Sequence, residues 1–487
     1  MKLTSANILS QTLGEGGGGE ILIKANHIDL LNGSAISTST LKSDGQGGNI
    51  NIEVTDTLEL SGSRQGFVGG YNNNNIFENV QSGFGSVTFG GGNGGTIEIT
   101  ANNLVVNGAS IGTATMGSGK AGNMKITVNN LSLKGGGTLT NGNGAFIGEK
   151  LFIGTGNGGE TNVSAKEKII IEGRNQIYSS SITSNTFSSG KGGNINIETD
   201  RLVLGDKGTI SANSIDINQG GIGPLLREKG FLKSSINIDN NGTGEGGSIN
   251  IQADNIILHN DSNISANSIG ILQLVKDGYM NLSVDSLLIG DNLIMDGNIK
   301  NSQLVGNAGN IKLTVGQLSL TNQAAISANA QASAGGNINL TSPGYLYLKD
   351  SYITTNVKEK GNGGNIKLNP EFIVLDSGKI LSLSQQGDGG KINISLTGLY
   401  NFSQGNLEEF INAKSSGGGI DGEVNINYAD TRLTENLLAL STEFDASNQL
   451  QTPCGAKLAE NLSSLVMVPS EGVTNAPNDL LPNSPYC

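Results

Sequence analysis

Histidines and clustered acidic residues are the side chains that could act as catalysts, and this sequence has few of them. The two histidines, His27 and His259, each adjoin an apolar pair of residues, which places both on an outer face or in a turn. Cleavage of a sugar polymer needs acids, or acids with Arg, Lys or His, that project into one groove. The sequence contains no Asp-Asp pair and no Gly-His-Gly triplet. We therefore predict no catalytic residue and no enzyme activity.

Two short motifs resemble ligand sites but fail on their context. The segment GEGGGG, Gly14 to Gly19, matches the Gly-x-Gly-x-x-Gly pattern, yet it leads into the strand-like EILIKA. No helix N-terminus would then hold a pyrophosphate. Asp239, Asn241 and Glu245 offer oxygens near calcium-loop spacing, but the glycine and the closing glutamate of a twelve-residue calcium loop are misplaced. We expect no cofactor and no metal site.

A repeated Gly-Gly sequence, followed by an alternating strand such as NINIE, organises most of the chain. Gly95 and Gly122 are 27 residues apart, and Gly364 and Gly390 are 26 apart, which gives the length of the bare unit. A degenerate copy, GYMNLSV at Gly278, divides the widest gap between copies, from Gly247 to Gly309. The glycine that opens each clear copy is Gly19, Gly48, Gly95, Gly122, Gly159, Gly193, Gly247, Gly309, Gly336, Gly364, Gly390 and Gly422, with Ala121, Ala308 and Asp421 in place of the first glycine in three of them.

Apolar residues recur at fixed offsets after each of these glycines. From Gly309 they are Ile311, Leu313, Leu318, Leu320 and Ile326. Apolar residues two positions apart indicate the alternation of a β-strand. The pattern of one unit therefore predicts three short strands and three turns. A unit of this size cannot bury its inner face alone, whereas stacked units form a continuous apolar interior. We predict an all-β, right-handed parallel β-helix of about thirteen coils with a short irregular C-terminal tail.

The same register predicts one buried column of isoleucines through the stack. Each member stands two residues after a corner glycine, where the first inward side chain of the unit is expected. The predicted column contains Ile50, Ile195, Ile249, Ile311, Ile338 and Ile366.

The paired glycines and the asparagine after them are expected to form corners between strands. Glycine takes positive φ without a Cβ penalty, and asparagine tolerates it better than most residues. Stacking repeats a corner directly above itself, so the asparagines are expected to form a ladder of amide hydrogen bonds. The predicted ladder contains Asn49, Asn123, Asn194, Asn310, Asn337 and Asn365.

The composition fits a repeat protein and argues against two kinds of partner. The chain has 74 glycines, no Trp and 15% charged residues, a balance suited to many tight turns. Its net charge of -13, with scattered basic residues, argues against nucleic acid as the main partner. No stretch approaches the roughly 18 apolar residues of a membrane span. The first residues also lack the apolar core of a signal peptide, so no export signal is expected within this chain.

A boundary near residue 430 follows from a change in composition. The glycine repeat ends after Gly422, and most prolines lie beyond residue 450. We expect a repeat domain over residues 1–429 and a Pro-rich tail over 430–487, in which TENLLALSTEF is a candidate short helix. The two cysteines, Cys454 and Cys487, lie in the tail and are compatible with a disulfide or with two unrelated thiols.

Insertions into the repeat are the expected carriers of function, because they become surface loops. Residues 64–92 are enriched in aromatic side chains, which form either a contact surface or a cap that widens the coil interior. Deleting Gly66 to Gly91 is expected to leave the stack standing. A second insertion covers residues 215–241. The candidate binding residues of the first insertion are Phe67, Tyr71, Phe77, Phe84 and Phe89.

The repeat resembles a known family of exoproteins. The segments GGTIEITANNLVVNGASIGTAT from Gly94 and GNIKLTVGQLSLTNQAAISANA from Gly309 are similar to filamentous-haemagglutinin-like proteins of two-partner secretion, particularly the cyanobacterial type. The resemblance covers residues 14 to about 430, and the tail segment SSLVMVPSEGVTNAPNDLL is similar to the family's ending except at PSEG. It implies a right-handed, pectin-lyase-like β-helix exported through a partner outer-membrane transporter. The family's secretion signal is an N-terminal secretion domain, which we do not expect within these residues.

Two functions remain open at this point. The resemblance implies a secreted or cell-surface structural exoprotein, adhesin-like, that attaches to a glycan or protein receptor. The alternative is a carbohydrate-active β-helix enzyme, a polysaccharide lyase or hydrolase, because one fold serves many functions. Three or more acids converging from neighbouring coils onto one concave strip would favour the enzyme.

Overall fold

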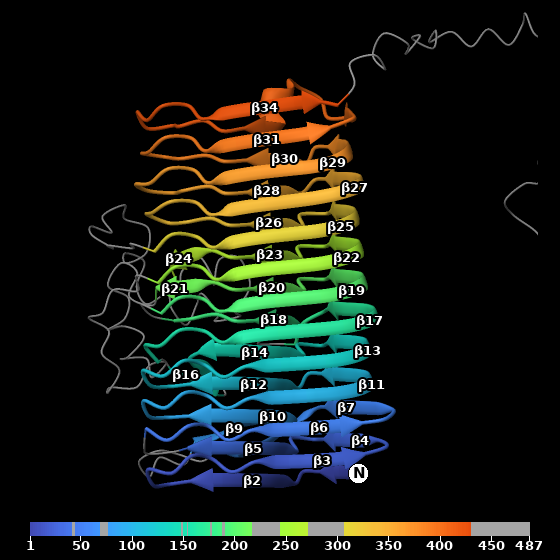
Figure 1. The fold of residues 1–487 in the computed structure, drawn as a ribbon, viewed down its shortest axis with the longest axis vertical. Coiled ribbons are helices and arrows are strands. Elements are labelled where there is room, and N and C mark those ends of the chain that lie inside the picture. The colour runs from blue at the N-terminus through green and yellow to red at the C-terminus, as the bar shows by residue number, and fades with distance from the viewer. Residues whose placement is uncertain are drawn as a thin grey trace, which may run out of the picture. The chain divides into compact units, whose positions relative to one another are not determined.

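A computed structural model of the chain shows a parallel β-helix (Figure 1). It describes residues 1–40, 44–68, 76–147, 150–152, 154–175, 178–187, 190–216, 244–270 and 306–429. Strands account for 60% of the structure and helix for 1%, so the predicted all-β class and β-helix are confirmed. One compact unit extends from Met1 to Ala429. The tail over residues 430–487, with both cysteines, lies outside the described residues.

A 16-stranded sheet, which we call the long-strand sheet, runs through the whole stack. Its strands follow the order β1-β4-β7-β11-β13-β17-β19-β22-β25-β27-β29-β31-β34, with β3, β6 and β32 pairing beside this path. The bounds are β1 Lys2–Thr4, β3 Ile21–Ala25, β4 Ile28–Leu31, β6 Ile50–Val54, β7 Thr57–Ser61, β11 Ile97–Asn107, β13 Met124–Lys134, β17 Glu160–Glu172, β19 Asn194–Gly205, β22 Ser248–His259, β25 Asn310–Thr321, β27 Asn337–Lys349, β29 Asn365–Asp376, β31 Lys391–Leu396, β32 Gly398–Asn401 and β34 Glu423–Tyr428.

A 12-stranded sheet, which we call the short-strand sheet, completes each coil. Its strands, in order, are β2 Asn7–Thr12, β5 Ala35–Thr40, β10 Gly83–Thr88, β12 Ser110–Thr115, β14 Thr138–Asn143, β18 Ser181–Thr183, β20 Thr209–Ser211, β23 Asn263–Ser265, β26 Ala325–Ser327, β28 Tyr352–Thr354, β30 Lys379–Leu381 and β33 Ile411–Asn412.

Several smaller elements lie outside the two main sheets. Two antiparallel hairpins and one parallel pair stand apart from the main sheets. They are β8 Ser63–Val68 with β9 Ile76–Gln81, β15 Ala145–Ile147 with β16 Lys150–Phe152, and β21 Ser214–Asp216 with β24 Ser268–Gly270. Helix α4 covers Leu407–Phe410. Within the described residues, no helix is long and apolar enough to cross a membrane.

Most coils contain one long strand where the sequence predicted two. In β11, Ala101 is buried, Asn102 and Asn103 are both partly exposed, and Leu104 is buried again. Two consecutive outward residues shift the alternation and return the inward face to the core, so no separate turn is needed. The prediction of three short strands is therefore wrong for these coils, although it holds where β3 and β4, or β6 and β7, are separate.

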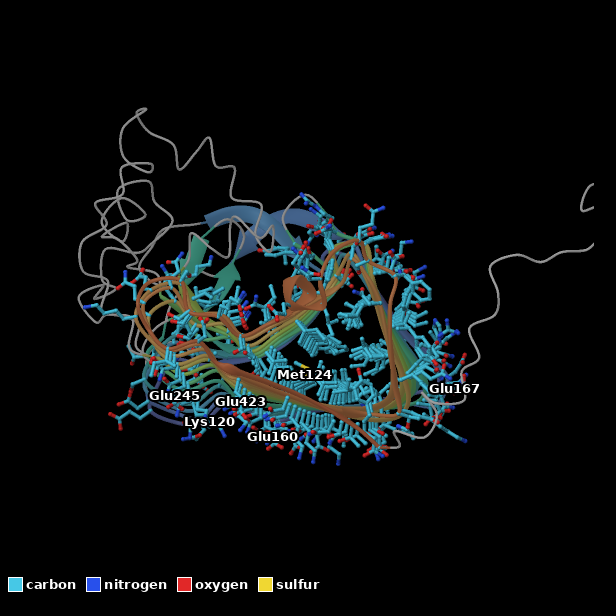
Figure 2. The ribbon with its side chains drawn as sticks, turned by 90° about the horizontal axis from the view of Figure 1, so that it is seen from above. Lys120, Met124, Glu160, Glu167, Glu245 and Glu423 are labelled. Carbon is cyan, nitrogen blue, oxygen red and sulfur yellow. The ribbon has the colours of Figure 1, made fainter. Side chains whose placement is uncertain are left out.

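The predicted isoleucine column is confirmed. Parallel pairing aligns Ile195 with Ile249, Ile249 with Ile311, and Ile311 with Ile338. All six predicted members are at most 1% exposed. Figure 2 looks down the stack and shows Met124, which aligns with Ile97 in this column, inside the coil. Each coil therefore buries its inward residues between the same residues of its two neighbours.

The degenerate copy at Gly278 does not supply a coil between its neighbours. Strand β22 pairs directly with β25 along its length, aligning Ile256 with Leu318. Residues 271–305 therefore form an insertion between two adjacent coils, and they lie outside the described residues. The prediction of a coil at this point is wrong, because a glycine and a weak alternation do not decide which strand a neighbour pairs with.

The Gly-Gly corners need glycine for a different reason than the one predicted. Positive φ occurs at other glycines, such as Gly62 and Gly108. At the corners, an added Cβ on Gly309 would overlap the carbonyl oxygen of Gly247, and one on Gly336 would overlap that of Gly309. The backbones of successive coils approach too closely there for any side chain. The prediction of positive φ at these corners is therefore wrong.

Most residues with positive φ lie at the corner that follows each long strand, whereas Gly144, Gly361 and Gly418 lie elsewhere. Gly108 has φ of 59°, and Asn260 and Asn322 take φ of 54° and 55° at the equivalent corner. Short polar residues tolerate this conformation better than other non-glycine residues. The left-handed turn is therefore formed at this corner, which was not singled out from the sequence.

The predicted asparagine ladder is continuous in one part of the stack. The side-chain amide of Asn337 donates to Asn310 at 2.7 Å, and that of Asn365 donates to Asn337 at 2.9 Å. Asn49 and Asn123 instead accept from the backbone N–H of Thr96 and Glu160 in the next coil. Asn194 stands at the same position, aligned with Glu160 and Ser248, where no asparagine is available as a partner.

Candidate functional site

The outer face of the short-strand sheet carries a groove of about 410 Å³. Small side chains form its floor, because outward residues of six neighbouring strands align in parallel register. The central row contains Ser37, Gly85, Gly112, Thr140, Thr183 and Ser211. A second row beside it contains Ala35, Gly83, Ser110, Thr138, Ser181 and Thr209. The floor therefore presents hydroxyl groups and exposed backbone.

Gly85 is a glycine that the stack does not require. Its φ is not positive, and an added Cβ would lie 3.7 Å from Cβ of Ser37, an ordinary contact. Glycine inside a strand costs stability, so its presence marks a bulge, a tight bend or a close approach by a ligand or backbone. Because β10 pairs in unbroken register with β5 and β12, neither a bulge nor a bend explains it. Gly85 therefore leaves the floor of the groove open beside Ser37 and Gly112.

The walls of the groove add apolar and amide groups. Gln81 at the end of β9, Met116, Tyr178 and Phe187 line it, together with Asn185. Phe187 is 8% exposed, so its ring is held in place by packing. Apart from the Tyr178 phenol, the described lining residues carry no ionisable side chain. The groove therefore presents hydrogen-bonding and apolar groups, and no charged ones among the described lining residues.

The predicted aromatic insertion is shorter than residues 64–92. Ser82 N–H donates to the Gly62 carbonyl oxygen at 2.9 Å, so the hairpin of β8 and β9 leaves and rejoins the coil at neighbouring points. Residues from Gly83 onward form β10, a regular strand of the short-strand sheet. The insertion therefore comprises residues 63–81. Deleting Gly66 to Gly91 would remove β10 as well, so that deletion is no longer expected to leave the stack intact.

The five candidate aromatic residues have different positions in the structure. Phe84 takes the place of an isoleucine between Ile36 and Ile111 and is 2% exposed, so its ring belongs to the core. Phe89 follows β10 and is half-buried. The backbones of Phe67 and Phe77 pair directly in the hairpin.

Other residues predicted for the insertions lie outside the described part of the chain, in whole or by their side chains. The side chains of Phe67 and Phe77 and the whole of Tyr71 lie there, as do residues 217–243. Ile215, the first residue of the second predicted insertion, is fully buried in β21 and belongs to the stack. That insertion therefore begins after Asp216.

A second asparagine ladder, whose members Asn185 and Asn213 line the groove, was missed by sequence reasoning. The side-chain oxygen of Asn213 accepts from Asn267 N–H, and that of Asn267 accepts from Asn329 N–H, both at 2.7 Å. Asn213 is 1% exposed and Asn267 is 6% exposed. The full ladder is Asn185, Asn213, Asn267, Asn329 and Asn356. Each member stands three residues after the isoleucine of a short strand, a spacing that could have revealed it.

The two histidines lie on the outside of the stack, as expected. His27 Nε2 contacts Asp29 Oδ1 at 2.7 Å, and its side chain is 43% exposed. The ring of His259 lies over Gly205 of the preceding coil, where a Cβ would meet its ring atoms. Neither residue lines the groove described above.

Charged residues of the long-strand sheet pair between successive coils. Lys24 with Glu53, Lys349 with Asp376, and Lys391 with Glu423 are 2.8, 3.0 and 2.6 Å apart. The hydrogen bond from Lys391 lowers the pKa of Glu423, and the hydrogen bond to Asp376 raises the pKa of Lys349. Glu160, Glu245 and Glu423 point away from the coil in Figure 2. These ion pairs are solvent-exposed, so each contributes little to the stability of the fold.

The rejected calcium motif has one described residue. Glu245 pairs with Lys191 at 3.4 Å, whereas Asp239 and Asn241 lie outside the described residues. Among the residues that the structure describes, no cluster of three or more His, Cys, Asp or Glu side chains is arranged to hold a metal ion.

Comparison with protein families, with characterised proteins and with solved structures finds no match to this chain. The fold and the groove are therefore the basis for assigning a function.

Proposed function

We propose that this chain is a secreted or surface-exposed structural exoprotein with an adhesin-like role, and that the groove of the short-strand sheet is its attachment site. Gly85 carries this proposal. A strand-interior glycine that packing does not need leaves the floor open, so that a ligand can approach the backbone. The receptor would be a cell-surface glycan or a protein segment that fits a narrow, uncharged groove.

The chemistry of the groove supports binding in preference to cleavage. Its floor offers the hydroxyls of Ser37, Thr140 and Thr183, and its walls offer the rings of Tyr178 and Phe187. Glycosidases place two carboxyl groups on opposite sides of the bond that they cleave, and acids are not among the described lining residues. We expect the purified protein to leave pectate and alginate intact, with or without calcium.

The resemblance of the repeat to two-partner-secretion exoproteins supports the proposed location. In that family the partner is an outer-membrane transporter, which would carry the chain to the cell exterior. A coil-by-coil fold suits such export, because each coil buries its apolar face on the one before it and stability propagates along the stack.

Gly85→Leu tests the attachment site. The leucine would project into the groove from a position with room for a Cβ, so we expect attachment to cells to fall at least tenfold. The unfolding midpoint should stay within about 2 °C of wild type, corresponding to less than about 1 kcal/mol. Thr341→Leu is the matched control, because Thr341 is also an outward, exposed strand residue but lies on the long-strand sheet. Unchanged attachment by a folded Gly85→Leu variant would overturn the assignment.

A further inference from the structure

A cluster of aromatic rings lies on the outer face of the long-strand sheet, away from the groove. Tyr345 and Tyr347 lie in β27, Phe372 in β29 and Tyr400 in β32, on three consecutive coils. Tyr345 aligns with Phe372, and Tyr347 aligns with Val374, which aligns in turn with Tyr400. We call these four residues the aromatic strip. Tyr345 is 39% exposed and Tyr400 is 47% exposed, in a chain with few aromatic residues.

Two rings of the strip, Phe372 and Tyr400, contact each other. Phe372 and Tyr400 have ring centroids 6.3 Å apart and ring planes inclined by 40°, a favourable aromatic contact. Gly398 lies beneath them, and an added Cβ there would come within 3.2 Å of Phe372 and 3.4 Å of Tyr400. Glycine at this position lets the Phe372 ring lean across the strand. The strip is therefore a preformed surface on a rigid sheet.

A shallow cleft of about 360 Å³ adjoins the strip. It is lined by Pro370, Ser395, Thr397, Asn427 and Tyr428. The hydroxyl and amide groups in this cleft are hydrogen-bonding groups of both kinds, donors and acceptors. Tyr428 aligns with the buried Leu396 and is 46% exposed at the end of the stack, so it lines the cleft without belonging to the strip. Rings and hydrogen-bonding groups therefore stand side by side.

The charges around the strip are balanced. Strands β27, β29 and β32 carry two basic residues, Lys349 and Lys367, and two acidic residues, Glu371 and Asp376. Lys349 pairs with Asp376 at 3.0 Å, which satisfies both charges within the protein. A surface without excess charge gives no electrostatic advantage to a polyanion or a polycation. Its complement is an uncharged ligand.

We propose that the aromatic strip and its cleft bind a neutral polysaccharide. A pyranose ring has an apolar face, formed by its C–H groups, and a rim of hydroxyls, which match exposed rings flanked by Ser, Thr and Asn. The coils repeat every 4.8 Å or so, and they offer rings at successive levels, as a polymer of repeating units requires. Protein partners draw most of their binding energy from buried pockets, whereas this surface is open. The site is separate from the groove, so either proposal can fail alone.

The test is the mobility of the protein in native gels cast with a neutral polysaccharide. Hydroxyethylcellulose, laminarin, dextran and galactomannan are the probes, and pectate and alginate are the charged comparisons. We expect retardation by at least one neutral polymer. The combined variant Tyr345→Ala, Phe372→Ala, Tyr400→Ala should weaken it at least tenfold. Tyr352→Ala, a partly buried outward tyrosine of the short-strand sheet, is the control and should bind normally.

Three results would overturn the proposal. The first is no retardation by any neutral polymer. The second is retardation only by pectate or alginate, and the third is binding that survives the triple substitution. If the triple variant unfolds, Tyr400→Ala alone replaces it, because Tyr400 is largely exposed near the end of the stack. Sedimentation that shows a wild-type dimer and a monomeric Tyr400→Ala variant would assign the strip to self-association instead.

Discussion

The Gly-Gly corner and the corner after the long strand both contain glycine, and they use it differently. At the Gly-Gly corner, Gly309 and Gly336 are needed because the backbone of the neighbouring coil occupies the space of a side chain. At the other corner, the backbone turns with positive φ, and Asn260 or Asp350 stands in for glycine. One corner is therefore a contact between coils, and the other is a local turn.

One insertion starts at the positive-φ corner, whereas residues 217–243 and 271–305 follow β21 and β24 on another side of the coil. The hairpin of β8 and β9 leaves from the positive-φ corner, between Gly62 and Ser82, where the turn is set by a few local dihedrals. At the Gly-Gly corner, the glycine just before the strand, such as Gly309 or Gly336, is fixed by the backbone of the neighbouring coil. Local turns tolerate replacement, whereas a shared contact does not.

The largest expected effect is on the buried column that both corners align. Ile311→Asp places a carboxylate between Ile249 and Ile338, where the isoleucine is fully buried. We expect a loss of about 4–5 kcal/mol in unfolding free energy, because a charge without a partner is buried. Denaturant unfolding measures it. A loss below about 1 kcal/mol would show that this column is not the core that the corners hold together.

The next largest effect on stability is expected when the two corners are compared by substitution. Gly309→Ala adds a Cβ that overlaps the Gly247 carbonyl oxygen, so the coils must separate and we expect a loss of about 2–3 kcal/mol. Gly108→Asn is the matched control, because its φ of 59° suits asparagine and the nearest atom to an added Cβ is 3.3 Å away. We expect that variant to change stability by less than about 1 kcal/mol. Equal losses in thermal unfolding would contradict the distinction between the corners.

A smaller effect is expected from a comparison of two asparagine ladders, one buried at Asn213 and Asn267 and the other exposed at Asn310, Asn337 and Asn365. Asn267→Ala removes the acceptor of the Asn329 N–H inside the stack, which we expect to cost about 1–3 kcal/mol. Asn337→Ala breaks exposed amide contacts to Asn310 and Asn365 and should cost about 0.5 kcal/mol or less. Amide hydrogen exchange at Asn329 should rise in the first variant. If the second variant loses more stability, the exposed ladder is the more important one.

Removal of the hairpin tests how local the positive-φ corner is. Deleting residues 63–81 joins Gly62 to Ser82, which reproduces the Gly108–Ala109 step of the next coil. The deletion loses the hydrogen bond from Arg64 Nη1 to the Ser5 carbonyl oxygen, so we expect a cost of about 1 kcal/mol. Thermal unfolding measures it. Deleting residues 66–91, which also removes β10, is the contrast and should disrupt the stack.

The smallest effect is the acid response of the Lys391–Glu423 pair. Its hydrogen bond lowers the pKa of Glu423 from the ordinary 4.5. The pair therefore contributes its full stabilisation above about pH 4.5, and the contribution is lost as pH falls through the lowered pKa. Because the pair is exposed, Glu423→Gln should barely alter the unfolding midpoint at pH 7 and should slightly flatten its fall in acid. A large difference at pH 7 would show that this coil depends on the pair.

Periodicity allowed much of the stack to be predicted, whereas the site could not be. The inward offsets repeat in every unit, so Ile195 and Ile311 could be assigned to one column from the sequence. The groove depends on which residues stand beside Gly85 in neighbouring strands, and these come from positions far apart in the chain. The aromatic strip escaped notice for the same reason, since Tyr345, Phe372 and Tyr400 lie in three separate units.

By itself, the sequence determined the all-β class, the inward face of each coil and the extent of the repeat, because alternation and turn residues act over a few neighbouring positions. Only the tertiary structure decided three further points. The copy at Gly278 is not a coil between its neighbours, and the hairpin insertion ends before Gly83. The corner glycines are required because the backbone of the next coil lies too close for a side chain. Each of these depends on pairing between segments distant in the chain. Such pairing follows from the packing of whole coils, which no local pattern contains.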